Sequence, residues 1–169
     1  MTKTARLILQ DAKYAIDKYS DELQGADFRI RWLAIITLLR AVGHGLNNVD
    51  AKTSSKMKLA VEVAHKKSEF DEMFLFIKKE RDRFIKNYEH GVMQSTYAIG
   101  HITKKDGSPG TFRLNISNPV NCRLDTTDGR YQSVIVDGPF AGKGGKFVVL
   151  QAYEWWLNYL DDVDRQANT

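Results

Sequence analysis

An arginine and a histidine near the middle of the chain have side chains suited to phosphodiester chemistry. Arg83 and His90 are seven residues apart, so two turns of a continuous helix would place them within about 20° of one another on one face. A guanidinium stabilises negative charge on a reacting phosphate, and an imidazole moves protons near neutral pH. With an RNA 2′-hydroxyl as nucleophile the pair needs no metal ion and no cofactor. Arg83 and His90 are therefore candidate catalytic residues, and a solvated helix face is the alternative.

The apolar stripe expected on the same helix is interrupted by two charged residues, Glu80 and Arg81. A charge on a core-facing stripe is costly unless it is paired. Arg40, at the end of a long apolar run, is a candidate partner. The sequence thus also predicts a buried or half-buried pair of Glu80 with Arg40 or Arg81, with Tyr88 hydrogen-bonded to it.

Arg40 and His44 are spaced i,i+4 and therefore share a helix face. Glycines on both sides of His44 would let another backbone approach closely. If this face meets the segment from Glu80 to Tyr88, the two helices frame one polar pocket inside an apolar bundle. The alternative is that His44 bonds free carbonyls where its helix ends. The supporting polar cluster is thus predicted to comprise Arg40, His44, Glu80, Arg81 and Tyr88.

Over residues 5–91 the chain resembles the HEPN family, in which a helical bundle carries an arginine followed, a few residues later, by a histidine near the end of a late helix. The resemblance makes Arg83 and His90 the catalytic pair. It implies a metal-independent ribonuclease, often of a toxin–antitoxin or antiphage system, whose site forms in a homodimer. Phe84 stands where the family usually has a small polar residue. In the other register, Arg81 is followed by the polar Asp82 and Tyr88 takes the distal place.

A second resemblance is to a family of small, uncharacterised bacterial helical proteins with an E-R-(N/D)…K-x-Y signature. Glu80-Arg81-Asp82 followed by Lys86 and Tyr88 matches it. The leucine-rich helix that ends in Arg40-Ala-Val-Gly-His44 is similar to theirs too. This resemblance covers more of the chain, and it implies a fold without an established activity.

The hydrophobic pattern predicts a mainly α fold, a bundle of about five helices with a small irregular or β-hairpin insert before the last helix. The whole chain, 1–169, is expected to be one domain with a four-helix part at 4–91, a glycine-rich insert at 92–146 and a C-terminal helix at 147–166. Within the first part the helices are expected at 4–23, 27–46, 54–66 and 68–88. Gly25 is expected to end the first helix, and Ser68 with Asp71 to form a capping box for the fourth.

The insert is expected to contain strands at 97–103 and 111–116 around a turn, and a third strand at 133–136, all lying over the helices. The stretch 137–146 (DGPFAGKGGK) departs from a phosphate-binding loop, because the spacing is one residue short and Gly144 replaces the Ser or Thr that would hold magnesium. It is expected to be a connector. Three aspartates near the end of the last helix oppose the helix dipole there.

Composition narrows the function classes. The chain has 169 residues, a net charge of +4 and a pI of about 9.1, which weakly favours an anionic partner. A single cysteine and four histidines without ligand spacing argue against a zinc site and against a disulfide framework. No apolar run approaches the ~20 residues of a membrane span. We therefore expect a cytoplasmic protein without membrane, metal or nucleotide cofactor.

Two functions follow from these patterns. The first is a HEPN-like protein acting on nucleic acid, a metal-independent ribonuclease of a defence or toxin–antitoxin type that works as a homodimer on RNA. The second is a non-enzymatic helical interaction module. Its polar cluster would be structural, and its apolar face would meet a partner or a second copy.

Overall fold

The computed structural model describes residues 1–20, 23–103, 105–116 and 129–169. Within these residues the protein is mainly helical, with five α-helices, a 3-10 helix and three strands, which confirms the expected fold class. The elements in chain order are α1 (Lys3–Asp17), α2 (Gly25–Asn48), η1 (Asp50–Thr53), α3 (Ser55–Ser68), α4 (Glu72–Asn87), β1 (Val92–Thr103), β2 (Pro109–Ile116), β3 (Gly129–Ile135) and α5 (Gly145–Ala167).

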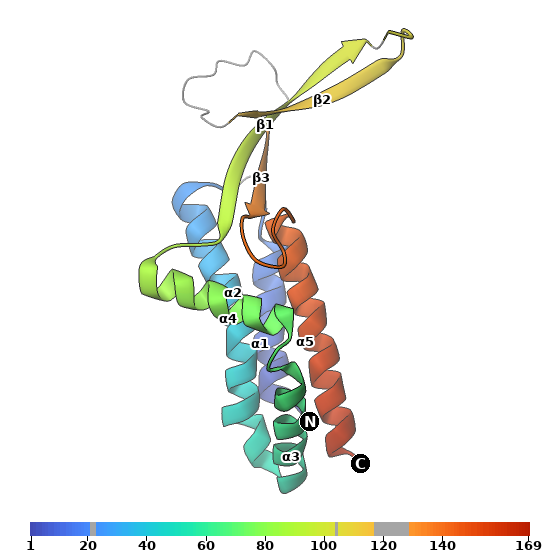
Figure 1. Ribbon diagram of the computed structural model, residues 1–169. Coiled ribbons are helices and arrows are strands. Elements are labelled where there is room, and N and C mark those ends of the chain that lie inside the picture. Colours follow the sequence, from blue (N-terminus) through green and yellow to red (C-terminus); the bar gives the residue numbers. More distant parts are fainter. Residues whose placement is uncertain (21–22, 104, 117–128) are drawn as a thin grey trace.

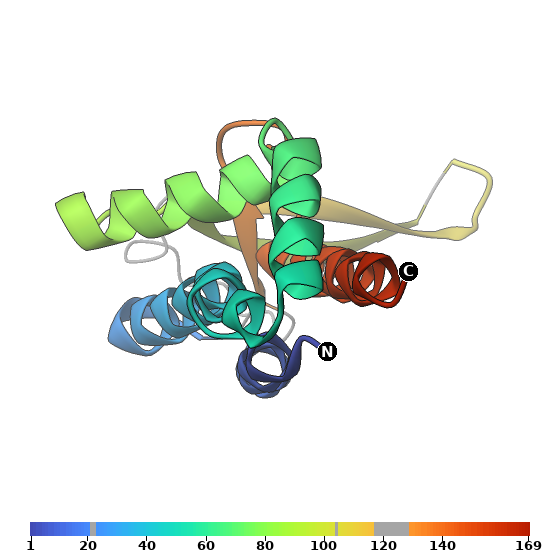
Figure 2. The same ribbon diagram turned by 90° about the horizontal axis from the view of Figure 1, so that it is seen from below.

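Three long helices, α1, α2 and α5, run along the body of the molecule, and α4 lies across them (Figure 1). Seen from below, α1, α2 and α5 bundle together with α3 against α5 (Figure 2). Apolar side chains from all five helices form one core. Its largest fully buried members include Trp32 of α2 and Trp156 of α5.

Helix α2 is central to the bundle, because α1, α4 and α5 all contact it. The two glycines beside His44 allow this close packing. The groups that approach them are side chains and not, as expected, another backbone. A Cβ on Gly43 would lie 3.2 Å from Trp156 Cη2, and one on Gly45 would lie 2.7 Å from Ile8 Cδ1. Both glycines therefore admit side chains from α5 and α1 against the surface of α2.

Two predicted helix boundaries were wrong. The first helix ends at Asp17, and Gly25 begins α2 with a φ of 54° instead of ending α1. Ser68 belongs to α3, and the carboxylate of Asp71 alone caps α4 by accepting the N–H groups of residues 73 and 74. A carboxylate at an N-cap satisfies free helix donors and favours the positive end of the helix dipole.

The insert forms an antiparallel sheet in the order β2-β1-β3. The central strand β1 starts beside β3 and continues beside β2, with registers that run from Val92↔Ile135 to Ala98↔Gly129 and from Thr96↔Ile116 to Thr103↔Pro109. All three expected strands are present. The expectation that they lie over the helices was wrong: the β1–β2 hairpin projects away from the helical body (Figure 1). We call this hairpin the ribbon.

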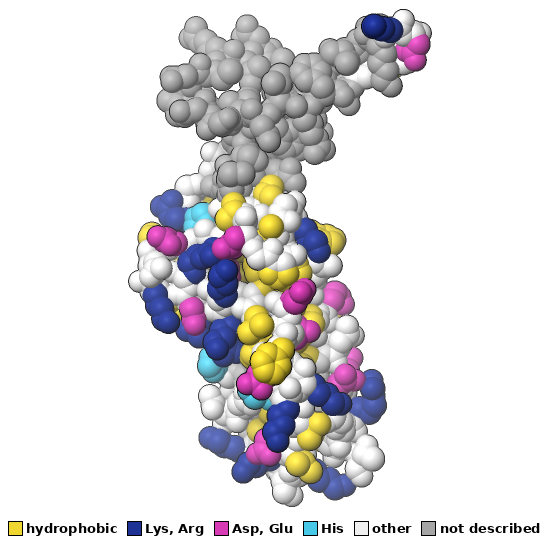
Figure 3. Space-filling view, viewed as in Figure 1, with side chains coloured by type: hydrophobic (Ala, Val, Ile, Leu, Met, Phe, Trp, Pro, Cys, Tyr) yellow, Lys and Arg dark blue, Asp and Glu magenta, His cyan; other side chains and the backbone are white. Residues whose placement is uncertain are grey.

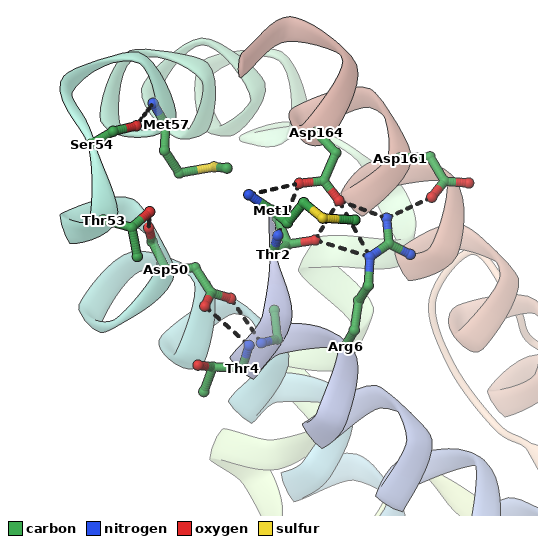
Figure 4. A network of polar contacts seen from close by, with 11 residues as sticks. Met1, Thr2, Thr4, Arg6, Asp50, Thr53, Ser54, Met57, Asp161 and Asp164 are labelled. Atoms are coloured by element: carbon green, nitrogen blue, oxygen red, sulfur yellow. Dashed lines mark hydrogen bonds and ion pairs between the residues drawn. The ribbon is translucent and has the colours of Figure 1, made fainter. Parts of the chain in front are cut away.

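The start of α1 is held by a buried aspartate from η1 (Figure 4). The two carboxylate oxygens of Asp50, a residue only 2% exposed, accept the backbone N–H groups of Thr4 at 3.0 Å and Ala5 at 2.9 Å. The first N–H groups of a helix have no partner within the helix. Asp50 therefore caps α1 from a distant part of the chain.

Two of the three aspartates near the end of α5, Asp161 and Asp164, face the same region and are paired there (Figure 4). Asp164 accepts hydrogen bonds from the backbone and hydroxyl of Thr2, at 2.8 and 2.9 Å, and from Arg6 at 2.9 Å, while Asp161 lies 2.6 Å from Arg6. Burial alone would raise the pKa of Asp164, but the hydrogen bonds from Arg6 and Thr2 outweigh it and the pKa is lowered. These partners offset the unfavourable helix dipole.

Candidate functional site

Helix α4 positions most of the predicted site. Its buried side chains lie on one stripe, and Glu80 stands on that stripe in place of an apolar residue. The helix ends at Asn87 because Tyr88 adopts a left-handed conformation, with a φ of 56°. His90 therefore lies beyond the helix, and the premise that Arg83 and His90 share one helix face was wrong.

Glu80 is a buried carboxylate, 3% exposed, and its partners are two N–H groups and an arginine. Its Oε1 accepts the indole N–H of Trp32 at 2.8 Å and the backbone N–H of Gly91 at 2.9 Å. Its Oε2 lies 3.8 Å from Nη1 of Arg83. The predicted pairing of Glu80 with Arg40 or Arg81 was wrong, whereas the expectation of a buried, paired glutamate was right.

The guanidinium of Arg83 is bound by acidic side chains of the protein. Besides Glu80, it bonds to Asp137, which follows β3, with Nη2 to Oδ2 at 2.6 Å and Nη1 to Oδ1 at 3.4 Å. The hydrogen bond from Arg83 lowers the pKa of Asp137, and the same bond raises the pKa of Arg83. This bidentate contact joins α4 to the segment that follows β3. Lys79 lies 3.4 Å from the same carboxylate.

Gly91 lies where these polar groups converge. A Cβ at this position would collide with Nη1 of Arg83, would lie 2.9 Å from Oε2 of Glu80, and would lie 3.3 Å from Oδ1 of Asp137. The carbonyl of Gly91 also accepts the N–H of Val136 at 2.9 Å. Glycine is thus required here for close approach, and the chain enters β1 from within the cluster. We call Trp32, Glu80, Arg83, Gly91 and Asp137 the root cluster.

His90 is half-buried between two aromatic rings at the same junction. Its ring makes an edge contact with Phe28 at 5.1 Å and stacks on Phe84 at 6.1 Å. Its Nδ1 lies 2.8 Å from the carbonyl of Val92, so Nδ1 carries the proton and donates it to that carbonyl. No hydrogen bond joins His90 to Arg83 among the described side chains.

The other predicted cluster members lie apart from Glu80. Arg81 pairs with its neighbour Asp82 at 3.0 Å, and the guanidinium of Arg40 lies 5.3 Å from the ring centre of Phe74. Burial, then Arg40 and then Arg81, lowers the pKa of the exposed His44, so these three side chains interact electrostatically. They form a separate group, on a different face of α4 from the root cluster.

Tyr88 does not reach Glu80. Its side chain is 65% exposed and makes an edge contact with Phe84, 5.3 Å between ring centres. The predicted hydrogen bond from Tyr88 to the glutamate pair was therefore wrong. The predicted polar pocket framed by two helices is instead two groups of charged residues, the root cluster and the Arg40–His44–Arg81 group.

A small cavity lies beside the root cluster. A cavity of about 140 Å³ lies between α4 and the segment after β3, and its lining includes Phe76, Lys79, Glu80, Asp137 and Pro139. Pockets that enclose small-molecule substrates usually measure about 300–1,000 Å³. This cavity therefore has room for water or a small ion and not for a nucleotide.

The glycine-rich stretch after β3 behaves as a connector within the described residues. Gly138 and Gly142 have φ angles of 77° and 80°, which form its turns. Phe140 packs edge-on against Phe76 of α4 at 5.1 Å, and the ammonium of Lys143 lies 5.2 Å from the Phe140 ring centre. The stretch holds α4 beside the start of α5.

The described residues hold neither a metal-binding group of side chains nor a helix that could span a membrane. No group of three or more His, Cys, Asp or Glu side chains is arranged to hold a metal ion. No helix there has both the length and the apolar character required to cross a membrane.

Three members of the root cluster were not predicted from sequence. In the sequence, Trp32 lies in an apolar run, Gly91 precedes the expected insert and Asp137 begins the expected connector. The indole N–H of Trp32 was the available signal, because a buried tryptophan needs a hydrogen-bond acceptor. Gly91 and Asp137 gave no signal, because their roles depend on how the sheet meets α4.

No protein-family model, curated protein sequence or solved structure matches this chain. The function is therefore inferred from the geometry and chemistry of the two charged groups and from the shape of the fold.

Proposed function

We propose that the protein is a non-enzymatic interaction module, in which a helical body carries a β-ribbon for contact with a partner. The observation that supports this most is the engagement of both candidate catalytic residues in internal contacts. Arg83 bonds to Asp137, and His90 bonds to Val92. Both contacts join α4 or its end to the strands, which is a structural task.

The root cluster explains how the ribbon is held. Glu80 bonds to the residue before β1, and Arg83 bonds to the second residue after β3. Both β1, which forms the ribbon with β2, and β3, which pairs with the first part of β1, are thereby fixed to α4. A rigid attachment lets an extended element present its surface in a defined direction, as binding elements on rigid scaffolds do.

A second candidate function is a HEPN-like ribonuclease, and one observation favours it. The guanidinium of Arg83 lies against Gly91, the residue after His90, so both candidate catalytic residues reach the same junction. Catalysis there would require Arg83 to leave Asp137 and to turn toward a phosphate beside Nε2 of His90. A second copy of the chain, as expected for this family, would have to supply the rest of the site.

Incubation of the purified protein with labelled single-stranded RNA in EDTA tests the two functions. We expect no cleavage, and we expect Arg83→Ala and His90→Ala to lower the melting temperature because internal contacts are lost. Asp137→Asn serves as a matched variant, because it weakens the hold on Arg83 without removing the arginine. Cleavage by the wild type that both alanine variants lose while still folded would establish the ribonuclease and overturn the proposal.

A further inference from the structure

Arg40 lies in an environment that the fold itself does not explain. Its guanidinium is partly buried over the ring of Phe74, and it forms no hydrogen bond or ion pair with another described residue. Its Nε atom is buried and has no hydrogen-bond partner. Buried donors almost always find an acceptor, and one that does not costs free energy.

Arg81 of α4 has the same unusual feature, a buried donor without an acceptor. Its Nε is also buried without a partner, and its one ion pair among the described side chains is with the adjacent Asp82 at 3.0 Å. Phe74, Lys78 and Arg81 follow one another at helical spacing, so the ring beneath Arg40 shares a face with both cations. We call Arg40, His44, Lys78 and Arg81 the cationic corner.

The charges of the cationic corner are not balanced within the protein. Burial, and after it the neighbouring Arg81, lowers the pKa of Arg40, and only Asp82 acts in the opposite direction. For His44, Arg40 and Arg81 add to the effect of burial. Like charges held together without enough carboxylates repel one another. An anion bound between them would relieve this repulsion and supply the missing acceptors.

The surrounding surface extends the positive charge along α4, and Lys and Arg side chains gather over this helix in Figure 3. Lys79 and Arg83 form ion pairs with Asp137. The remaining cations of α4 are Lys78, Arg81 and Lys86. The acids of this helix outside the core are Asp82 and Glu72. A row of cations suits a ligand with repeated phosphates.

An exposed aromatic ring completes this surface. Tyr88 ends α4 with 65% of its side chain exposed, and Ile85 beside it is 59% exposed. Proteins that bind single-stranded nucleic acid combine cations along the backbone with aromatic rings on which bases stack. The ring of Tyr88 is therefore available for a base while Arg81 and Lys78 contact phosphates.

We propose that the cationic corner of α2 and α4 binds the phosphodiester backbone of a single-stranded nucleic acid. Arg40 and Arg81 contact one phosphate, Lys78 contacts a neighbouring phosphate, and Tyr88 stacks on a base. The inference goes beyond the proposed function, because it adds a second binding surface, on the helical body, and gives the chemistry of its partner. It uses residues separate from Arg83 and His90.

Fluorescence anisotropy with labelled single-stranded RNA and with DNA of the same sequence, over a range of NaCl concentrations in EDTA, tests the proposal. We expect Arg40→Gln/Arg81→Gln to weaken binding by about tenfold or more, because charged hydrogen bonds are lost. The slope of log affinity against log salt should fall by about 0.7 for each phosphate contact removed. Lys78→Gln/Arg81→Gln provides a second variant, in case loss of Arg40 from Phe74 impairs folding.

The matched control is Lys52→Gln/Lys56→Gln, which removes the same charge from exposed positions on η1 and α3. It should bind like the wild type. Equal weakening in the control, or unchanged binding in both test variants, overturns the cationic corner. Absence of wild-type binding to RNA and to DNA overturns it too and leaves the interaction module standing.

Cleavage dependent on Arg83 and His90 would overturn the proposed function instead. Tighter binding of RNA than of DNA would mean that the protein recognises the 2′-hydroxyl. Equal binding of the two would mean that it recognises the phosphate without the 2′-hydroxyl.

Discussion

The carboxylate of Glu80 contributes to stability through the donors that it satisfies. Replacement by alanine would leave the N–H groups of Trp32 and Gly91 without an acceptor inside the protein. Because each unsatisfied buried donor costs about 1–3 kcal/mol, we expect Glu80→Ala to lower the free energy of unfolding by about 3 kcal/mol. Urea denaturation followed by circular dichroism measures this.

Glu62→Ala, on the exposed face of α3, is the control for Glu80→Ala and should change the free energy of unfolding by no more than about 0.5 kcal/mol. Glu80→Gln should be intermediate, because its carbonyl oxygen still accepts hydrogen bonds. Equal stability of Glu80→Ala and the wild type would show that the root cluster is not structural.

The imidazole of His44 reports on the cationic corner. Burial, Arg40 and Arg81 all disfavour its charged form, so its pKa lies below the ordinary histidine value. Arg40→Gln removes one positive neighbour and should raise the pKa of His44, which an NMR titration of the ring protons would detect. Arg165→Gln, at the exposed end of α5, should leave it unchanged. An unaltered pKa in Arg40→Gln would show that the two side chains are not neighbours in solution.

At the scale of single residues, the sequence indicated which positions were unusual but not which partners they have. Glu80 stood out because a charge interrupted an apolar stripe. Its acceptor role toward Trp32 and Gly91 could not be predicted, because it depends on the crossing of α4 over α2 and on the entry into β1. A cation partner was expected on charge alone, and two N–H groups supply most of the contacts.

At the scale of elements, the start of α1 depends on a residue 46 positions away in the chain, since Asp50 accepts the N–H of Thr4. Loss of this cap leaves two buried helix donors unsatisfied. We expect Asp50→Ala to lower the free energy of unfolding by about 2 kcal/mol, as strong N-cap substitutions do. Thermal unfolding with Asp11→Ala as the exposed control on the same helix measures it. A loss no larger than that of the control would contradict the capping role.

The helices could be predicted because each has a periodic apolar face, whereas their ends depended on competing signals. Gly25 is typical of a helix end, but its positive φ here begins α2. Ser68 and Asp71 both suit an N-cap, and the chain uses the second. Strand pairing around the turn at 105–108 was also predictable, but the projection of the ribbon was not, because the sequence does not show what covers a strand.

At the scale of the molecule, the ribbon and the helical body are predicted to be separable. Thr96 of β1 pairs with Tyr131 of β3, so a short turn could join the chain at these two positions. We expect replacement of 97–130 by Asn-Gly, a two-residue hairpin turn, to leave a cooperative unfolding transition with Tm within about 5 °C of the wild type. Differential scanning calorimetry measures this.

Trp156→Ala provides the contrasting variant, because it removes a fully buried side chain that α2 and α5 share and should lower Tm far more. A shortened chain that melts without cooperativity would show that the body needs the ribbon in order to fold. A shortened chain that still binds nucleic acid would locate binding on the body.

The helical body is discontinuous in sequence, and this has a consequence for the order of events during synthesis. Helices α1 to α4 leave the ribosome first, but their core is completed by Val148, Val149, Trp156 and Leu160 of α5. The ribbon, paired between near neighbours in the chain, is made in between. A nascent chain therefore carries a locally paired hairpin on a body whose apolar side is still open to chaperones until the last helix arrives.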